Sequence, residues 1–209
     1  MTITPQPSEK PRSRFITAAA FSGGFVALLW VLEIIDALTN QRLDDNGVRP
    51  WTLDGLWGII FAPVLHSDWA HLISNTVPAF VLTFVIVVSS GTTRWLESTA
   101  IIWVTAGAGT WLIGGLNTNH IGASSLIFGW VTFLVLRGIF ARRMGEIAIG
   151  VVIAAVYGYL VWGVLPLTPG VSWQGHLCGA IGGVIAAVIL GRRSVAERRP
   201  SRLRSSPPR

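Results

Sequence analysis

The sequence predicts an all-α polytopic membrane protein with six transmembrane helices and both termini in the cytoplasm. Three observations lead to this fold class. Of the 209 residues, 51% are hydrophobic. Only 12% are charged, about half of the roughly 25% in a typical soluble domain. The charges are also separated by windows long enough for the roughly 20 apolar residues that one spanning helix requires.

Four such windows contain no Asp, Glu, Lys or Arg. They lie between Arg14 and Glu33, between Asp68 and Arg94, between Glu97 and Arg137, and between Glu146 and Arg192. The first two windows have room for one span each. Each of the last two has room for two spans, with a polar break near its middle. We therefore predict spans at about residues 15–37, 70–89, 95–115, 121–140, 147–165 and 174–191.

The positive charges predict the orientation, because Lys and Arg concentrate in cytoplasmic connections. With the N terminus inside, only Arg42 and Arg49 of the 16 Lys and Arg residues fall on the outer side. The predicted regions are a cytoplasmic tail at residues 1–14, a membrane domain at 15–191 and a basic, disordered cytoplasmic tail at 192–209. The net charge of +6 thus reflects topology and contact with membrane lipids, and we expect no nucleic-acid partner.

The first outer connection, residues 39–68, is unusually long and apolar. Its stretch 48–65 carries Trp51, Trp57 and several aliphatic residues, but it is too short and interrupted to span a bilayer. One interpretation is an interfacial segment with its tryptophans at headgroup depth. The other is a folded loop packed on the helix bundle, and the two are compatible.

Polar side chains are costly inside a bilayer, so they indicate pairing or function. The second span begins with His71 and Asn75, which are four residues apart and share one helix face. The fourth span begins with Ser124 and the sixth with His176. Each residue alone has an ordinary explanation, as an interface marker or a helix contact. All three spans enter from the outside in the predicted topology, so together these residues predict an active site at one depth.

This set of residues suits nucleophilic catalysis. A serine hydroxyl becomes a nucleophile when a neighbouring base accepts its proton, and His176 is the candidate base for Ser124. The windows that hold these two residues contain no carboxylate, so we expect a Ser–His dyad in place of a triad. His71, Asn75 and the backbone N–H of Ser124 are the candidate donors to an oxyanion.

Three motifs follow one another along the chain: His71-x-x-x-Asn75, Gly122-Ala-Ser124-Ser125 and His176-x-x-Gly179. Together they resemble the motifs of the rhomboid intramembrane serine proteases, over about residues 50–190. The resemblance implies a six-helix rhomboid-like bundle that hydrolyses peptide bonds in or next to transmembrane segments of other proteins. No cofactor and no metal is implied. With the predicted orientation, the active site would face the outer side of a bacterial-type plasma membrane.

The resemblance also implies a role for each matching residue. Ser124 would be the nucleophile and His176 its base, with His71 and Asn75 lining the oxyanion site. The remaining matches have supporting roles: Gly122, Phe128, Gly179 and His66.

Three positions depart from the family pattern. Ser125 replaces the second glycine of the usual Gly-x-Ser-Gly, which reduces backbone freedom. Gly58 follows Trp57 where many relatives have Trp-Arg, so an arginine that would anchor to lipid is missing. Phe128 stands in place of a tyrosine that stacks on the base histidine, which keeps the ring and loses the hydroxyl.

Other classes of membrane protein fit less well. A zinc metalloprotease requires His-Glu-x-x-His, and no histidine of the second span is directly followed by a carboxylate. A paired-aspartate protease requires Asp within its spans, and predicted spans two to six have none. Spacing does not support a zinc site built from His66, His71, His120 and His176, and no inverted repeat suggests a transporter. The main rival is a catalytically inactive rhomboid-like protein that binds membrane clients. Such proteins usually lack the serine or the histidine, and both are present here.

Overall fold

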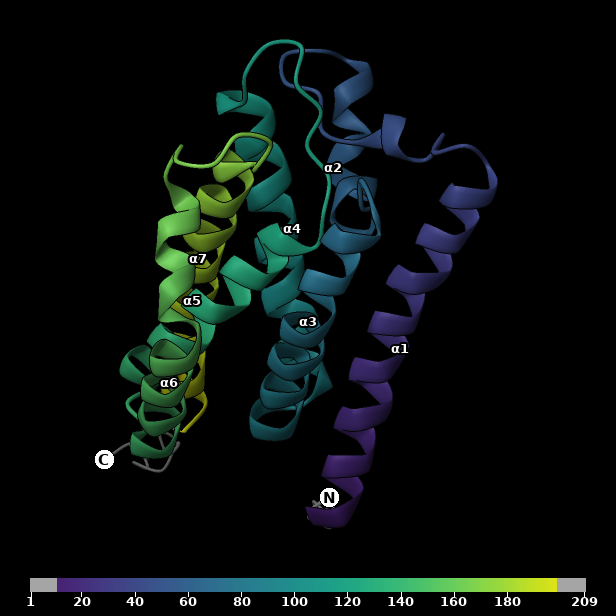
Figure 1. The fold of residues 1–209 in the computed structure, drawn as a ribbon. Helices are drawn as coiled ribbons and strands as arrows, with labels where there is room; N and C mark the ends of the chain where they lie inside the picture. Colours follow the sequence, from purple (N-terminus) through teal and green to yellow (C-terminus); the bar gives the residue numbers. More distant parts are fainter. Residues whose placement is uncertain (1–10, 199–209) are drawn as a thin grey trace, which may run out of the picture.

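The computed structural model describes residues 11–198 of the chain (Figure 1). Within that range it contains helices and no β-strand. Six helical segments are long and apolar enough to cross a membrane, which confirms the predicted all-α fold class and number of spans. The cytoplasmic location of both termini stays a prediction. They are α1 (Pro11–Leu38), α3 (Trp69–Ser90), α4 (Thr92–Ile113), α5 (Ser124–Ala141), α6 (Met144–Tyr157) with its 3-10 extension η4 (Gly158–Val164), and α7 (Trp173–Glu197).

The start of α1 and the end of α7 lie at the same end of the bundle, as an even number of crossings requires (Figure 1). α7 continues past the predicted boundary at residue 191 to Glu197, so the first residues assigned to the basic tail are helical. Arg193 pairs with Glu197 at 3.1 Å and with Glu97 of α4 at 2.8 Å. The predicted span ended at the first charged residue after the apolar window. The helix itself continues through charged residues when they form ion pairs at its end. Residues 199–209 of the predicted tail lie outside the described residues.

Small residues on α7 allow it to pack closely against α5. A Cβ atom at Gly179 would overlap the carbonyl group of Ser125, and one at Gly183 would overlap that of Gly129. On another face of α7, a Cβ at Gly182 would press on Ile102 of α4. Because small residues let helix backbones approach each other, α7 lies in close contact with both α5 and α4.

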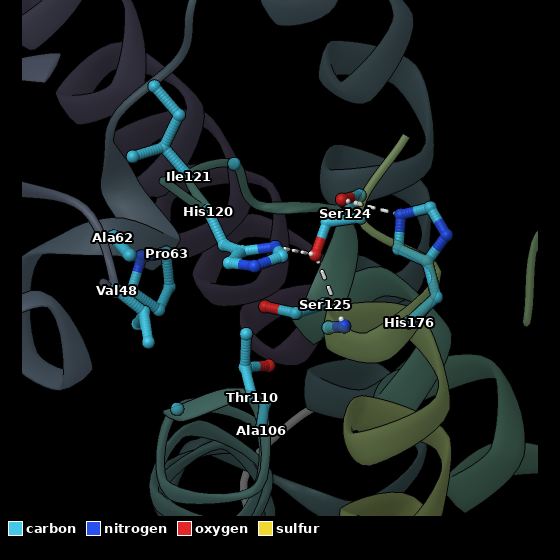
Figure 2. Close-up of a pocket in the computed structure, with 14 residues that line it drawn as sticks. Val48, Ala62, Pro63, Ala106, Thr110, His120, Ile121, Ser124, Ser125 and His176 are labelled. Atoms are coloured by element: carbon cyan, nitrogen blue, oxygen red, sulfur yellow. Dashed lines mark hydrogen bonds between the residues drawn. The ribbon is translucent and has the colours of Figure 1, made fainter. Parts of the chain in front are cut away.

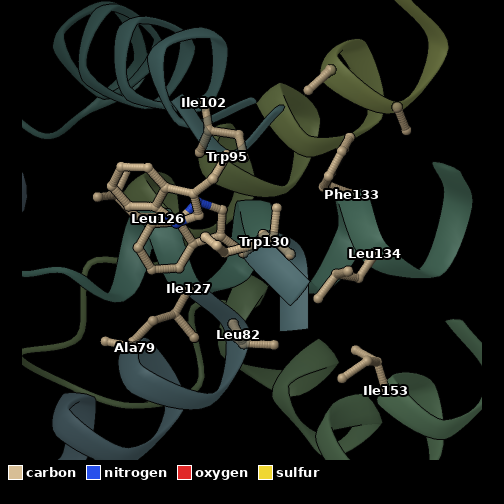
Figure 3. Close-up of a cluster of buried hydrophobic side chains, with 14 of the residues drawn as sticks. Ala79, Leu82, Trp95, Ile102, Leu126, Ile127, Trp130, Phe133, Leu134 and Ile153 are labelled. Carbon is tan, nitrogen blue, oxygen red and sulfur yellow. The ribbon is translucent and has the colours of Figure 1, made fainter. Parts of the chain in front are cut away.

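The main buried core takes residues from all six long helices, most of them from α3, α4 and α5 (Figure 3). Trp130 of α5 is completely buried, and its indole N–H donates to Thr99 Oγ1 of α4 at 2.9 Å. Trp95 near the start of α4 donates to Thr83 Oγ1 of α3 at 3.1 Å. Each large ring is therefore both packed and hydrogen-bonded to a neighbouring helix, which is the usual arrangement for buried indoles.

The segment between α4 and α5, residues 114–123, runs back into the bundle before α5 begins (Figure 1). His120 exchanges two backbone hydrogen bonds with Val48, at 2.9 and 3.0 Å. The N–H of Gly122 donates to the carbonyl of Ala62 at 2.9 Å. These contacts with the outer connection hold the segment inward, so α5 begins below the level at which α4 ends.

The outer connection is a folded loop that packs on α4. It contains η1 (Asp44–Asn46), η2 (Asp54–Leu56), α2 (Gly58–Phe61) and η3 (Ala62–Val64). Trp103 donates its indole N–H to the carbonyl of Ile59 at 2.7 Å, and Trp111 donates to that of Thr52 at 2.9 Å. Trp51 and Trp57 are 58% and 63% exposed. The folded-loop interpretation is therefore confirmed, while contact of these tryptophans with headgroups stays a prediction.

Candidate active site

Ser124 is the first residue of α5, and the backbone before it requires glycine. Gly122 has a φ of +122°, and a Cβ atom there would strike the His71 ring. The Ser124 Oγ lies 2.9 Å from the Nε2 of His176 (Figure 2). Two residues that are 52 positions apart in the sequence are thus in hydrogen-bond contact.

His176 lies in the first turn of α7, and its ring is held from two sides. Its Nδ1 is 2.8 Å from the carbonyl oxygen of Gly163 in η4. A carbonyl only accepts, so Nδ1 carries the proton and Nε2 of the neutral ring is the acceptor for the Ser124 hydroxyl. Phe128 stacks on the imidazole, with ring centroids 4.0 Å apart and planes 8° apart. The ring therefore has both the tautomer and the orientation that a general base for Ser124 requires.

His71 and Asn75 lie on the first turns of α3, next to this pair. Asp68 caps α3 by accepting the backbone N–H of His71 at 2.8 Å, and this bond holds the pKa of the Asp68 carboxyl below its usual range. The Asn75 side chain is buried, and its Nδ2 has no hydrogen-bond partner within the described residues. A buried amide without a partner is a donor available to a bound group.

A cavity of about 760 Å³ is lined by the two predicted dyad residues and the two predicted side-chain donors to the oxyanion. It runs between the starts of α3, α5 and α7, the η4 segment and residues 169–172. The structure therefore brings Ser124, His176, His71 and Asn75 to one space, and that space is large enough for an extended stretch of polypeptide.

His66 lies behind this set and does not line the cavity. Its ring is 1% exposed and meets the His71 ring edge to face, with centroids 5.1 Å apart. Burial, with a smaller contribution from the charge of His71, lowers the pKa of His66 to about 3. His66 is therefore neutral at ordinary pH, and its ring packs against that of His71. A supporting role for His66 stays a prediction.

Comparison with known proteins identifies the family of this chain. A family model described as rhomboid domain matches residues 53–193. The chain belongs to the rhomboid family. This confirms the resemblance found in the motifs and, with the six apolar helices, makes this rhomboid an integral membrane protein.

Several relatives of this rhomboid are known. An uncharacterized protein of Mycobacterium tuberculosis is 48% identical over 195 residues, which cover 90% of this chain and 81% of that protein. An uncharacterized protein of Mycobacterium leprae is 45% identical over 210 residues, 97% of this chain and 82% of that protein. Rhomboid-type serine protease 2 of Debaryomyces hansenii is 26% identical over 184 residues, 81% of this chain and 63% of that protein.

The three departures from the family motifs have simple local explanations in this rhomboid. Ser125 points away from His176 and lines a smaller cavity with Thr110 (Figure 2). A Cβ at Gly58 would overlap the backbone of Gly47 and Val48, so an arginine there would require the outer connection to move. Phe128 makes the stacking contact with His176 through its ring alone.

A hydrogen-bond chain beside the dyad was not expected from the sequence. The Thr118 hydroxyl donates to the Gly115 carbonyl at 2.6 Å, so its oxygen accepts the Nε2–H of His120 at 2.7 Å. The Nδ1 of His120 is then the acceptor for the Ser172 hydroxyl, also at 2.7 Å. Burial lowers the pKa of His120, which favours this neutral ring.

Ser172 connects this chain to the base. It is the N-cap of α7, with its Oγ accepting the Gly175 N–H at 3.2 Å and its carbonyl accepting the His176 N–H at 3.1 Å. We call the His120–Ser172 pair the clasp, because it joins the segment before Ser124 to the turn that carries His176. The spacing of Ser172 and Gly175 is a weak N-cap signal in the sequence. Nothing in the sequence identifies His120 as its partner.

The positions of the histidines in this rhomboid decide whether they lie close enough together to ligate a metal ion. Within residues 11–198, no three His, Cys, Asp or Glu side chains are grouped so that they could hold a metal ion. His120 is engaged by Thr118 and Ser172, and His176 by Ser124 and Gly163.

Proposed function

We propose that this rhomboid is an intramembrane serine endopeptidase with a Ser124–His176 dyad. The observation that carries the proposal is the 2.9 Å contact between Ser124 Oγ and the unprotonated Nε2 of His176, whose tautomer follows from the Gly163 carbonyl. A base within hydrogen-bond reach of a hydroxyl, itself oriented by a third group, is the arrangement that activates a serine.

In this mechanism Ser124 Oγ attacks the carbonyl carbon of the scissile peptide bond while its proton passes to His176 Nε2. His176 then gives that proton to the departing amine, leaving an acyl ester on Ser124. A water molecule, deprotonated by the same Nε2, attacks the ester carbonyl and releases the second product. The Gly163 carbonyl faces Nδ1–H throughout and stabilises the imidazolium, in the role that a carboxylate has in a triad.

The tetrahedral intermediate requires donors for its oxyanion. The free Nδ2 of Asn75 and the His71 ring face the same cavity as Ser124. The backbone N–H of Ser124 is also available, because it lies in the first turn of α5. These three groups are the proposed oxyanion site.

The proposed substrates are membrane proteins with a transmembrane segment that unwinds near the site, because an intact helix holds its carbonyls in hydrogen bonds. We further propose that both termini are cytoplasmic and that cleavage occurs towards the outer side of a plasma membrane. The asymmetry of Lys and Arg supports this orientation.

The activity is tested with purified protein and a generic type I membrane substrate. Ser124→Ala and His176→Ala should abolish cleavage, while the matched control Ser125→Ala should keep most of it. A fluorophosphonate probe should label Ser124 of the wild type. A folded wild-type protein that neither cleaves the substrate nor reacts with the probe would instead support the inactive, client-binding alternative.

The orientation is tested with single cysteines in a Cys178→Ser background. Leu116→Cys lies in the segment between α4 and α5 at a residue that is 72% exposed, and Ala196→Cys lies at the far end of α7. A membrane-impermeant thiol reagent on intact cells should label position 116 and spare position 196. The opposite pattern would invert the topology and the side of cleavage.

A further inference from the structure

A second cavity, of about 310 Å³, lies at the end of the bundle where α1 begins and α7 ends. Five arginines from five parts of the chain line it: Arg14, Arg94, Arg137, Arg143 and Arg198. We call it the basic cavity. It is separate from the proposed active site and shares no lining residue with the cavity that holds Ser124.

Part of the charge around the basic cavity is balanced. Arg94 lies 3.1 Å from Glu97 and 2.9 Å from Glu197. Arg193 pairs with the same two carboxylates, at 2.8 and 3.1 Å. These two arginines and two glutamates form a closed network with no net charge.

The other arginines outnumber their carboxylates. Glu146 is shared by Arg143 at 3.2 Å and Arg137 at 3.8 Å. Among the salt bridges within residues 11–198, none involves Arg14 or Arg198, and the side chain of Arg198 donates to the backbone carbonyls of Ser194 and Ala141. The walls of the basic cavity therefore carry more positive than negative charge.

Arg137 makes this excess significant because its side chain is only 3% exposed. Two of its nitrogens donate to the hydroxyls of Ser89 and Ser90, which are neutral, and its Nε has no hydrogen-bond partner within the described chain. Phe133 packs against the guanidinium, 5.6 Å from its ring centroid. A buried charge is costly unless an opposite charge compensates it, and Arg137 has to share the Glu146 carboxylate with Arg143, so this position favours a bound anion.

We propose that the basic cavity binds a phosphate group. A phosphate presents several acceptor oxygens to guanidinium groups that approach from different sides, which arginine recognises better than lysine does. The cavity is lined by residues at the ends of the spanning helices, and basic pockets between membrane helices are typical sites for anionic headgroups. The phosphate is therefore carried by an anionic lipid such as phosphatidylglycerol, or it is free in solution.

Native mass spectrometry of the full chain in detergent tests this inference, which does not depend on the proposed protease activity. The protein is mixed with equal amounts of phosphatidylglycerol and phosphatidylcholine. Wild type should retain phosphatidylglycerol preferentially. Arg14→Gln and Arg198→Gln should each weaken that retention about fivefold, the effect of one arginine near a phosphate surface. Arg137 is left intact because it also bonds α3.

Arg42→Gln is the matched control, since Arg42 is an exposed arginine of the outer connection. It should retain phosphatidylglycerol as the wild type does. A parallel titration with inorganic phosphate distinguishes the two sources. Displacement of the lipid means that free phosphate occupies the same site, and no displacement means that the headgroup is the ligand. Equal retention of both lipids, or equal losses in all three variants, would overturn the proposal.

Discussion

Ser172→Ala is the most informative single change outside the dyad, because one oxygen atom makes two contacts. That oxygen caps α7 through the Gly175 N–H and donates to His120 Nδ1. Loss of an N-cap costs about 1 kcal/mol. The unsatisfied His120 acceptor adds about 1 kcal/mol, the lower end of the range for buried groups, because the ring is only partly buried. We expect the free energy of unfolding to fall by about 2 kcal/mol.

The assay is unfolding of the purified protein in mixed micelles with increasing denaturing detergent, followed by the fluorescence of its 10 tryptophans. Ser125→Ala is the matched control. It removes the same atom from a neighbouring site, and Ser125 makes no side-chain hydrogen bond within the described residues. Its unfolding free energy should stay within about 0.5 kcal/mol of the wild type.

The same pair of variants tests the link to the site. Fraying of the first turn of α7 should slow fluorophosphonate labelling of Ser124 in Ser172→Ala but not in Ser125→Ala. The reasoning is refuted if the two variants unfold with the same free energy. It is also refuted if a double-mutant cycle with His120→Ala shows no coupling, because residues in one hydrogen-bond network couple by about 0.5–3 kcal/mol.

Three further predictions concern single residues. If the clasp positions His176, His120→Asn should preserve much of kcat, since its amide oxygen can reproduce the acceptor at Nδ1, whereas His120→Gln should lower kcat with little change in KM. Equal kcat values in the two variants would mean that the clasp does not position His176. Asn75→Ala should lower kcat by about 10²–10³, as loss of one oxyanion donor does, while the thermal unfolding temperature stays unchanged; wild-type turnover would exclude that role. His66 is neutral when folded, with a pKa of about 3, but takes up a proton near pH 6.5 when unfolded. Above about pH 6.5 the ring is neutral in both states, so its titration leaves the stability unchanged. Below that pH only the unfolded state takes up the proton, so stability should fall as the pH drops towards 3, by at most about 1.4 kcal/mol per pH unit; a His66→Phe variant should lack this component in pH-dependent unfolding.

The number of spans could be predicted from the sequence because the bilayer imposes a local requirement. Each crossing needs about 20 apolar residues whose backbone N–H and C=O groups form hydrogen bonds within the helix itself. Charge-free windows therefore identified all six crossings without knowledge of their packing. The end of α7 was missed by the same criterion, because Arg193 is paired with Glu97 of another helix.

The residues of the candidate site were also accessible from the sequence, since Ser124, His176, His71 and Asn75 are polar groups at the starts of apolar helices. Their costly placement distinguishes them from the surrounding residues without any structure. Their partners were not accessible in this way. The Gly163 carbonyl is a backbone group of the kind that every residue carries. Neither composition nor spacing can therefore identify it as the partner of His176.

Only the tertiary structure decided how these groups are held. The inward path of residues 114–123, the clasp between His120 and Ser172, and the close approach of Gly58 to Gly47 all join segments that follow no shared periodicity. The arginines of the basic cavity come from five separate parts of the chain. Taken one at a time, each of them indicates only the orientation of the chain in the membrane. Membrane insertion depends on each segment by itself, whereas the tautomer of a histidine or the balance of a buried charge depends on which segments meet.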